Sequence, residues 1–138
     1  MNIKYVTPED KDFWLSIDKH TSHKQFEDKI LKKSGYVMWE NGIPVGLLHF
    51  CTLWDNLPFL NFIFVPEEFR GNGFGKEAML QWEQKMKEQG FKMVLISTQV
   101  NEEAQHFYRK LGYVDCGGLV LHNTPFEQPM EMFMRKIL

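Results

Sequence analysis

The sequence predicts a single α/β domain over residues 1–138, with a mixed central sheet of six or seven strands and about four flanking helices. The chain has 138 residues, which suits one domain and is short for two. Segments of helical periodicity alternate along it with strand-like segments. Hydrophobic residues make up 43% of the chain and charged residues 25%, which is typical of a folded globular protein.

The first elements are expected to be one strand and two helices. Residues 2–6 alternate apolar and polar side chains, which indicates a strand. Thr7 followed by Pro8 is typical of a helix start, because threonine caps the first N–H groups and proline has none to leave unpaired. Ser22 opens a capping box for a second helix, and Gly35 is expected to end that helix.

Three strands should follow. Residues 36–39 and 43–53 read as strands joined by Asn41-Gly42, a pair that favours a two-residue hairpin turn. Residues 59–65 are almost all apolar, so we expect this strand to be buried on both faces.

The second half of the chain should alternate helix and strand, ending in two strands. The expected elements are a helix over 74–89 ended by Gly90, a strand over 93–98, a helix capped by Asn101 and ended by Gly112, and strands over 113–121 and 130–136.

Composition and charge exclude several classes of function. The net charge of −2 gives no overall positive field for nucleic acid. No apolar run approaches the roughly 20 residues that span a bilayer, and the start lacks a secretory segment. Two cysteines cannot form a disulfide framework and fit a reducing compartment. We therefore expect a cytoplasmic monomer or homodimer without nucleic-acid or membrane partners.

Three alternate glycines separate the buried strand from the long helix, in the segment Arg70-Gly71-Asn72-Gly73-Phe74-Gly75-Lys76. Glycine permits positive φ and close approach of a ligand, and the helix amino terminus attracts anions. A tight turn alone is the alternative, but it would need only one glycine. The phosphate loop of nucleotide hydrolases and the dinucleotide fingerprint both fail here, because neither spacing of glycines is met. The segment predicts a diphosphate site.

The spacing Arg-x-x-Gly-x-Gly is met by Arg70, Gly73 and Gly75, and a second segment contains Asn101-x-x-Ala104-x-x-Phe107-Tyr108. With these motifs the chain resembles the GCN5-related N-acetyltransferase (GNAT) family over nearly its whole length. The resemblance implies the acyl-CoA N-acyltransferase fold, in which two neighbouring parallel strands splay apart. It also implies acetyl-CoA as cosubstrate, with the primary amine of a small molecule or peptide as acceptor.

The resemblance further implies a set of site residues and no metal. Tyr108 matches the tyrosine that gives a proton to the leaving thiolate, although its spacing also fits a core aromatic. The expected cofactor-binding residues are Ile63, Phe64, Val65, Arg70, Gly71, Asn72, Gly73, Phe74, Gly75, Lys76, Asn101, Ala104, Phe107 and Tyr108.

The base that would deprotonate the amine is not evident. Residues 59–65 hold no carboxylate, and Asn61 is their only polar side chain. A water chain is one alternative, and a CoA-binding module without catalysis is another. An interaction domain that binds no cofactor is a third. The candidate bases are Glu40, His49, Asp55, Glu67 and Glu68.

We expect the early helices and residues 121–129 to shape the acceptor pocket. We also expect Lys29, Lys32 and Lys33 to form a solvated helix face.

Overall fold

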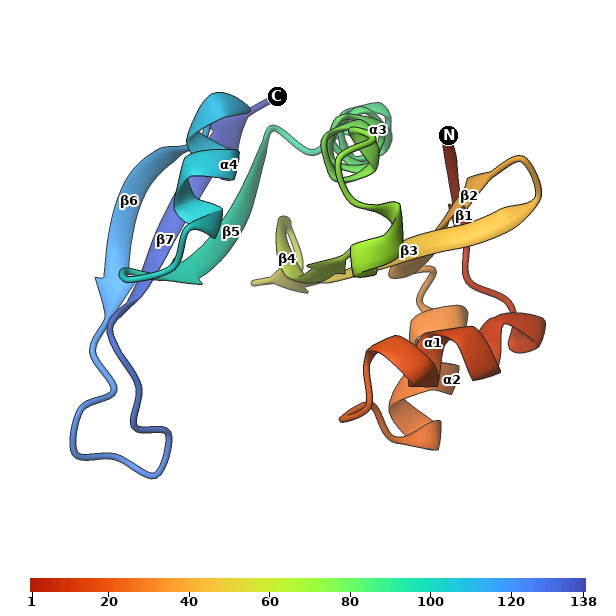
Figure 1. The fold of residues 1–138 in the computed structure, drawn as a ribbon. Coiled ribbons are helices and arrows are strands. Elements are labelled where there is room, and N and C mark those ends of the chain that lie inside the picture. Colours follow the sequence, from red (N-terminus) through yellow and green to blue (C-terminus); the bar gives the residue numbers. More distant parts are fainter. The chain divides into compact units, whose positions relative to one another are not determined.

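The computed structural model describes residues 1–138 and contains seven strands and four α-helices (Figure 1). The strands follow the order β1-β2-β3-β4-β5-β7-β6 in a mixed sheet, and the predicted order of elements is confirmed. None of the helices has both the length and the apolar character that crossing a membrane requires. The elements are β1 (Asn2–Tyr5), α1 (Lys11–Ile17), α2 (His23–Leu31), β2 (Gly35–Glu40), β3 (Ile43–Leu53), β4 (Leu57–Phe64), α3 (Phe74–Glu88), β5 (Met93–Gln99), α4 (Ala104–Lys110), β6 (Val114–Leu119) and β7 (Glu131–Ile137), with single 3₁₀ turns η1 (Pro8–Asp10) and η2 (Glu67–Phe69).

Packing divides the chain into two compact units. The first consists of Met1–Cys51 and Asn61–Lys85, and the second of Thr52–Leu60 and Met86–Leu138. Strand β4 contributes its carboxyl half to the first unit and its amino half to the second. The expectation of one domain over residues 1–138 stays a prediction.

In the first unit, helices α1 and α2 lie on one side of β1–β3 and α3 on the other (Figure 1). The core under α1 and α2 is formed by Val6, Trp14, Phe26, Val37 and Leu47, all nearly inaccessible to solvent. Burying such side chains supplies most of the driving force for folding, at about 25 cal/mol per Å² of apolar surface. This core fixes α1 and α2 against the sheet.

The opposite face of the same strands is covered by α3. Trp82 of α3 packs against Phe50 of β3 with ring centroids 5.7 Å apart, and Phe50 stacks on Tyr36 of β2 at 6.3 Å. Met79, one turn before Trp82, is also fully buried. The alternation of side chains along β2 and β3 therefore serves two cores, one on each face of the sheet.

The start of α2 agrees with its predicted capping box, but its end does not. Ser22 Oγ accepts a hydrogen bond from the backbone N–H of Gln25 at 3.1 Å, and Gln25 Oε1 accepts one from Ser22 N at 2.8 Å. The prediction that Gly35 ends this helix is wrong, because Gly35 is the first residue of β2. A Cβ atom there would lie 2.7 Å from the ring of Trp14. Gly35 is therefore a packing glycine.

The strands that follow α2 confirm one expectation and correct another. Asn41 and Gly42 have φ values of 50° and 77°, as a two-residue hairpin turn between β2 and β3 requires. The prediction that residues 59–65 are buried on both faces is wrong: Asn61 and Phe64 are exposed, and Phe62 is half-buried. Because Asn61 lines an open cavity, this half of β4 does not need to be apolar on both faces.

The second unit is built on β5, β6 and β7. Strand β7 pairs antiparallel with both β5 and β6, and β5 pairs parallel with β4 at Phe59 and Leu95. The splay that the resemblance implies beyond this pair stays a prediction. The prediction that Asn101 caps α4 is wrong, because Glu103 occupies the N-cap position. The Glu102 side chain accepts a hydrogen bond from Gln99 N at 3.0 Å, which holds the intervening residues in a turn.

Candidate functional site

The glycine-rich loop at the start of α3 has the backbone shape that the sequence predicts. Gly71 and Gly73 have φ values of 82° and 78°, in the left-handed region that disfavours other residues. A Cβ atom on either glycine would meet nothing within 4 Å, so the space beside the loop is open. Gly73 O accepts the N–H of Glu77 at 3.0 Å, which makes Gly73 the first carbonyl of the helix. The N–H groups at the start of α3 are available to an anion.

Two polar side chains of the loop fix its path. Arg70 Nε donates to the carbonyl of Val65 at 2.8 Å, and its guanidinium lies 5.3 Å from the ring centre of Phe64. Asn72 Nδ2 donates to the carbonyl of Phe69 at 3.0 Å. These contacts tie the loop to the end of β4. Lys76 remains exposed on the first turn of α3, where its charge adds to the attraction for an anion.

The carboxyl half of β4 is positioned by close contact with β3. A Cβ atom on Gly46 would lie only 2.6 Å from the carbonyl oxygen of Phe64. The ring of Phe62 stacks on Phe64 at 6.1 Å and on His49 at 5.5 Å. The backbone around Phe64, where the resemblance places the thioester, therefore has little freedom to move.

In the second unit, Tyr108 is buried on α4, with 6% of its surface exposed. Its ring meets Phe107 edge-on at 5.2 Å and Tyr113 at 5.8 Å. Burial, together with the negative charge of Glu102, raises the pKa of Tyr108 to about 12. The phenol therefore keeps its proton at neutral pH and can donate a hydrogen bond.

The predicted cofactor residues thus fall into two groups. Ile63–Val65 and Arg70–Lys76 belong to the first unit, and Asn101, Ala104, Phe107 and Tyr108 to the second. Asn101 is exposed, whereas Ala104 and Phe107 are half-buried. Their binding of the cofactor stays a prediction.

A cavity of about 460 Å³ lies in the first unit, between α1, α2, β3 and β4. Its lining includes Asp18, Thr21, Gln25, Lys29, His49 and Asn61. Of the candidate bases, only His49 lines it. Glu40 pairs instead with the amino terminus at 3.1 Å, and Glu67 and Glu68 are exposed on η2. Asp55 lies in the exposed turn before β4.

His49 forms a hydrogen-bonded pair with Asp18. His49 Nε2 lies 3.2 Å from Asp18 Oδ2, and the imidazole packs between the rings of Trp14 and Phe62. Burial, with the nearby charge of Lys29, lowers the pKa of His49 to about 4 although Asp18 opposes this. The imidazole is neutral at pH 7, so Nε2–H donates to the carboxylate and the pair keeps a full negative charge.

No sequence pattern identifies Asp18 as a candidate site residue. It is the residue that follows α1, a position where a polar side chain is ordinary. Burial would raise the pKa of Asp18, but hydrogen bonds from Thr21 and His49 outweigh it and hold that pKa below its usual value. The carboxylate is therefore ionised at neutral pH. Only the fold, which places β3 beside the end of α1, distinguishes it.

Lys29 also differs from expectation. It is half-buried and lines the cavity, so it is not part of a solvated face, and burial lowers its pKa. Its neighbour Lys32 is exposed and pairs with Asp28 at 2.9 Å, whereas Lys29 forms no ion pair. Helical spacing cannot distinguish the two lysines, because only the position of the sheet decides which one faces the cavity.

The neutral state of His49 gives a testable dependence of stability on pH. Unfolded histidine gains a proton near pH 6.5, whereas folded His49 does so only near pH 4, so stability is lost as the pH falls between these values. Between pH 7 and pH 5 this group should remove about 1–2 kcal/mol from the free energy of unfolding. Urea unfolding of the wild type and of His49→Gln should show this decline only in the wild type. His106→Gln, which removes an exposed imidazole, should decline as the wild type does; an equal decline in His49→Gln would contradict the assignment.

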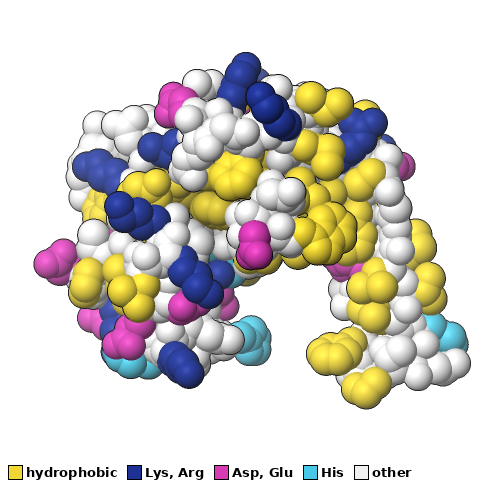
Figure 2. Space-filling view, turned by 180° about the vertical axis from the view of Figure 1, so that it is seen from behind, with side chains coloured by type: hydrophobic (Ala, Val, Ile, Leu, Met, Phe, Trp, Pro, Cys, Tyr) yellow, Lys and Arg dark blue, Asp and Glu magenta, His cyan; other side chains and the backbone are white.

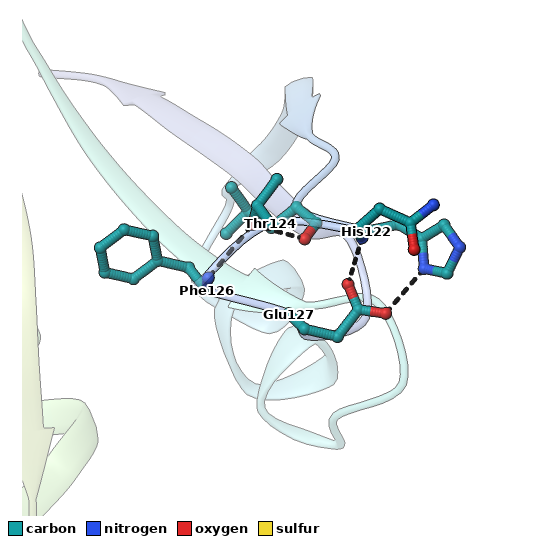
Figure 3. Close-up of polar contacts among 6 residues, drawn as sticks. His122, Thr124, Phe126 and Glu127 are labelled. Carbon is teal, nitrogen blue, oxygen red and sulfur yellow. Dashed lines mark hydrogen bonds and ion pairs between the residues drawn. The ribbon is translucent and has the colours of Figure 1, made fainter.

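The connection between β6 and β7 is ordered by its own hydrogen bonds (Figure 3). Glu127 accepts hydrogen bonds from His122 Nδ1 at 2.7 Å and from Asn123 N at 2.6 Å, and Thr124 Oγ1 donates to Leu121 O at 2.7 Å. The ring of Phe126 points away from these contacts and is 74% exposed. Figure 2 shows hydrophobic side chains at this tip of the second unit. These hydrogen bonds give the loop a defined turn, and its exposed side chains include the apolar ring of Phe126.

A mixed sheet whose fourth strand leads through a glycine-rich loop into the start of a helix is suited to a phosphorylated ligand. The model of the acetyltransferase (GNAT) family matches residues 3–113. The chain belongs to this family, whose cosubstrate is acetyl-CoA. No curated protein sequence gives a significant match.

Solved structures agree on the fold. A ribosomal-protein-alanine N-acetyltransferase from Brucella melitensis is 18% identical, with a TM-score of 0.83 and full coverage of both chains. Naa50 from Arabidopsis thaliana, in complex with a bisubstrate analogue, is 16% identical with a TM-score of 0.79, covering 98% of this chain and 97% of that one. An aminoglycoside 6'-N-acetyltransferase complexed with coenzyme A is 16% identical with a TM-score of 0.74, covering 99% and 97%. At these identities the likeness establishes the fold.

Proposed function

We propose that this acetyltransferase moves the acetyl group of acetyl-CoA to a primary amine of a small molecule or peptide, by direct attack while both substrates are bound. The observation that supports this most directly is the open glycine loop at the amino terminus of α3, with Gly71 and Gly73 in the left-handed conformation. Similar folds act on proteins or on an aminoglycoside, as their names state.

The loop fits the diphosphate of coenzyme A. The space that a Cβ would occupy at Gly71 and Gly73 is free, and the first N–H groups of α3 lack helical partners. Lys76 adds a positive charge, while Arg70 and Asn72 keep the loop in shape. When bound, acetyl-CoA supplies an activated acetyl group and a thiolate leaving group. The backbone of Ile63, Phe64 and Val65 would hold the arm that carries it, and an amide there would polarise the thioester oxygen.

Tyr108 would stabilise the thiolate of coenzyme A as it leaves. A protonated phenol stabilises a thiolate by donating a hydrogen bond, and burial excludes water that would weaken that bond. Ala104 and Phe107, on the same helix, and Asn101 before it would contact the cofactor.

Amine-dependent release of thiol from acetyl-CoA tests the proposal. The acceptors to be screened are polyamines, aminoglycosides, amino acids and peptides with free amino termini. At least one of them should raise the rate of thiol release and yield an acetylated product of the expected mass. Binding of CoA without any acetylated product would indicate a CoA-binding module that lacks catalysis, for which the absence of a carboxylate on β4 is the argument.

The diphosphate assignment gives a prediction for Gly73. Gly73→Glu should bind CoA at least tenfold more weakly, because its side chain fills the open space and adds negative charge beside the diphosphate. Gly42→Glu is a matched control: Gly42 has nearly the same φ, 77° against 78°, and equally open surroundings, but it lies in the β2–β3 turn. Isothermal titration should find wild-type affinity in the control. Equal affinities in the two variants would show that the loop does not hold the diphosphate.

A further inference from the structure

The cavity of the first unit contains one carboxylate, on Asp18, and one ammonium group, on Lys29, that form no ion pair with another charged side chain. The two charges lie close enough to attract each other, but they are not in contact. Asp18 is hydrogen-bonded to neutral His49, so its negative charge is not cancelled. Lys29 forms no ion pair, because Asp28, the nearest acid on its own helix, pairs with Lys32. A charge that is partly withdrawn from water is costly unless an opposite charge compensates it.

The cavity also borders the strand that is expected to present the acetyl group. Asn61 of β4 lines it, and Cys51 Sγ donates to Asn61 Oδ1 at 3.4 Å. Phe62, the next residue of β4, stacks on His49 at the cavity, and Phe64 stacks on Phe62, so this side of the strand continues from the cavity to Phe64. A ligand in this cavity therefore lies against the same side of β4.

We propose that this cavity binds an acceptor that carries both a primary amine and a carboxylate, with its ammonium group on Asp18 and its carboxylate on Lys29. The inference rests on the acetyltransferase function proposed above and narrows its acceptor to amino acids and related zwitterions. A volume of about 460 Å³ is in the range of small-molecule sites. A phosphorylated amine fits less well, because a dianion would face one lysine with Asp18 and Asp28 nearby.

All charged and titratable groups at the cavity agree with this arrangement. From the turn after α1 come Asp18 and His20, from α2 Asp28 and Lys29, and from β3 His49. Cys51 of β3 is also close enough to Lys29 to influence the pKa of the lysine. Asp28 is neutralised by Lys32, and His49 is uncharged at pH 7. The zwitterion should therefore bind best near neutral pH, where Asp18 is ionised and the acceptor carries both charges.

The test compares amino acids with their amides in both kinetics and binding. Glycine, β-alanine, 4-aminobutyrate and L-lysine vary the distance between amine and carboxylate, and each amide removes only the negative charge. In the wild type, KM for the best amino acid should be at least tenfold lower than KM for its amide. Lys29→Gln should remove this preference by raising KM for the amino acid, and it should change KM for the amide less than about twofold.

A second variant tests the site of the ammonium group, and a third serves as a control for the loss of a lysine. Asp18→Asn should raise KM at least tenfold for both the amino acid and its amide, since both carry the ammonium group. Lys24→Gln, on the same helix but exposed and away from the cavity, should keep the wild-type preference. Affinity for CoA, measured by isothermal titration, should stay unchanged in all three variants, which shows that they remain folded.

Failure of this inference is distinguishable from failure of the proposed function. Acetylation of amines with equal KM for amino acids and amides, unaffected by Lys29→Gln, would overturn the zwitterion site and leave the acetyltransferase intact. If none of the series is acetylated, the same compounds are titrated into CoA-saturated protein. Absence of binding at millimolar concentration then overturns the inference, whereas Lys29-dependent binding of the amino acid without turnover supports it and contradicts the proposed catalysis.

Discussion

Tyr108→Phe is expected to lower kcat by about 10²–10⁴-fold while the affinity for CoA stays as in the wild type. The variant keeps the buried ring and its contacts with Phe107 and Tyr113, so stability should change little. Only the hydroxyl that would donate to the thiolate is lost. Steady-state kinetics and isothermal titration measure the two quantities.

The raised pKa of Tyr108 sharpens this expectation. Complete transfer of a proton from a phenol of pKa about 12 to a thiolate of pKa about 8.5 is unfavourable by roughly 5 kcal/mol. Tyr108 should therefore act chiefly as a hydrogen-bond donor. Because the phenol loses its proton only near pH 12, kcat should show no fall below pH 10 that Tyr108→Phe abolishes.

Tyr113→Phe is the matched control. Tyr113 is equally buried and lies beside Tyr108, but it belongs to the segment that leads into β6. Its variant should keep kcat within about threefold of the wild type, given that no role in transfer is assigned to it. Turnover near the wild-type value in Tyr108→Phe would leave Tyr108 as a core aromatic without a catalytic role.

Trp14→Ala should lower the free energy of unfolding by about 3–5 kcal/mol, or about 10²–10⁴-fold in the unfolding constant. Trp14 is fully inaccessible and packs on Phe26 at 5.9 Å and on His49 at 5.6 Å. Gly35 approaches it so closely that no Cβ fits between them. Removing the indole would leave a cavity that such tightly packed surroundings cannot close.

Trp54→Ala provides the comparison, because Trp54 is 83% exposed in the turn between β3 and β4. Its loss should change the free energy of unfolding by no more than about 0.5 kcal/mol. Urea unfolding followed by circular dichroism measures both variants. A loss below about 1 kcal/mol in Trp14→Ala would contradict the packing under α1 and α2.

The order of elements could be predicted because each depends on local signals. The Asn41-Gly42 turn needs positive φ at both residues, and the capping box at Ser22 needs side chains three residues apart. The loop before α3 needs glycines where φ is positive. Such signals lie within a few residues of one another, so they can be recognised without knowing what packs against them.

Three expectations failed where a distant part of the chain decided the outcome. Residue 35 is a glycine because Trp14, which is 21 positions earlier, leaves no room for a side chain, and Lys33, with a φ of 51°, takes the left-handed position after α2 instead. Asn61 interrupts the burial of β4 because a cavity opens against it from α1 and α2. Lys29 is not solvated because the cavity beside β3 and β4 opens on its side of α2. The expectation for Asn101 failed for a local reason instead: the Glu102 side chain accepts a hydrogen bond from Gln99 N and holds the chain in a turn up to Glu103, which caps α4.

By itself, then, the sequence determined the family, the order of strands and helices, and the glycine loop, all of which follow from short-range patterns. The tertiary structure alone decided which polar groups share a cavity. Asp18, Lys29 and His49 lie on three different elements, and their sequence spacing carries no sign of proximity. Partial burial strengthens the electrostatic effect of these charges, because water would screen the charges of an aspartate and a lysine that were exposed on the surface of a helix.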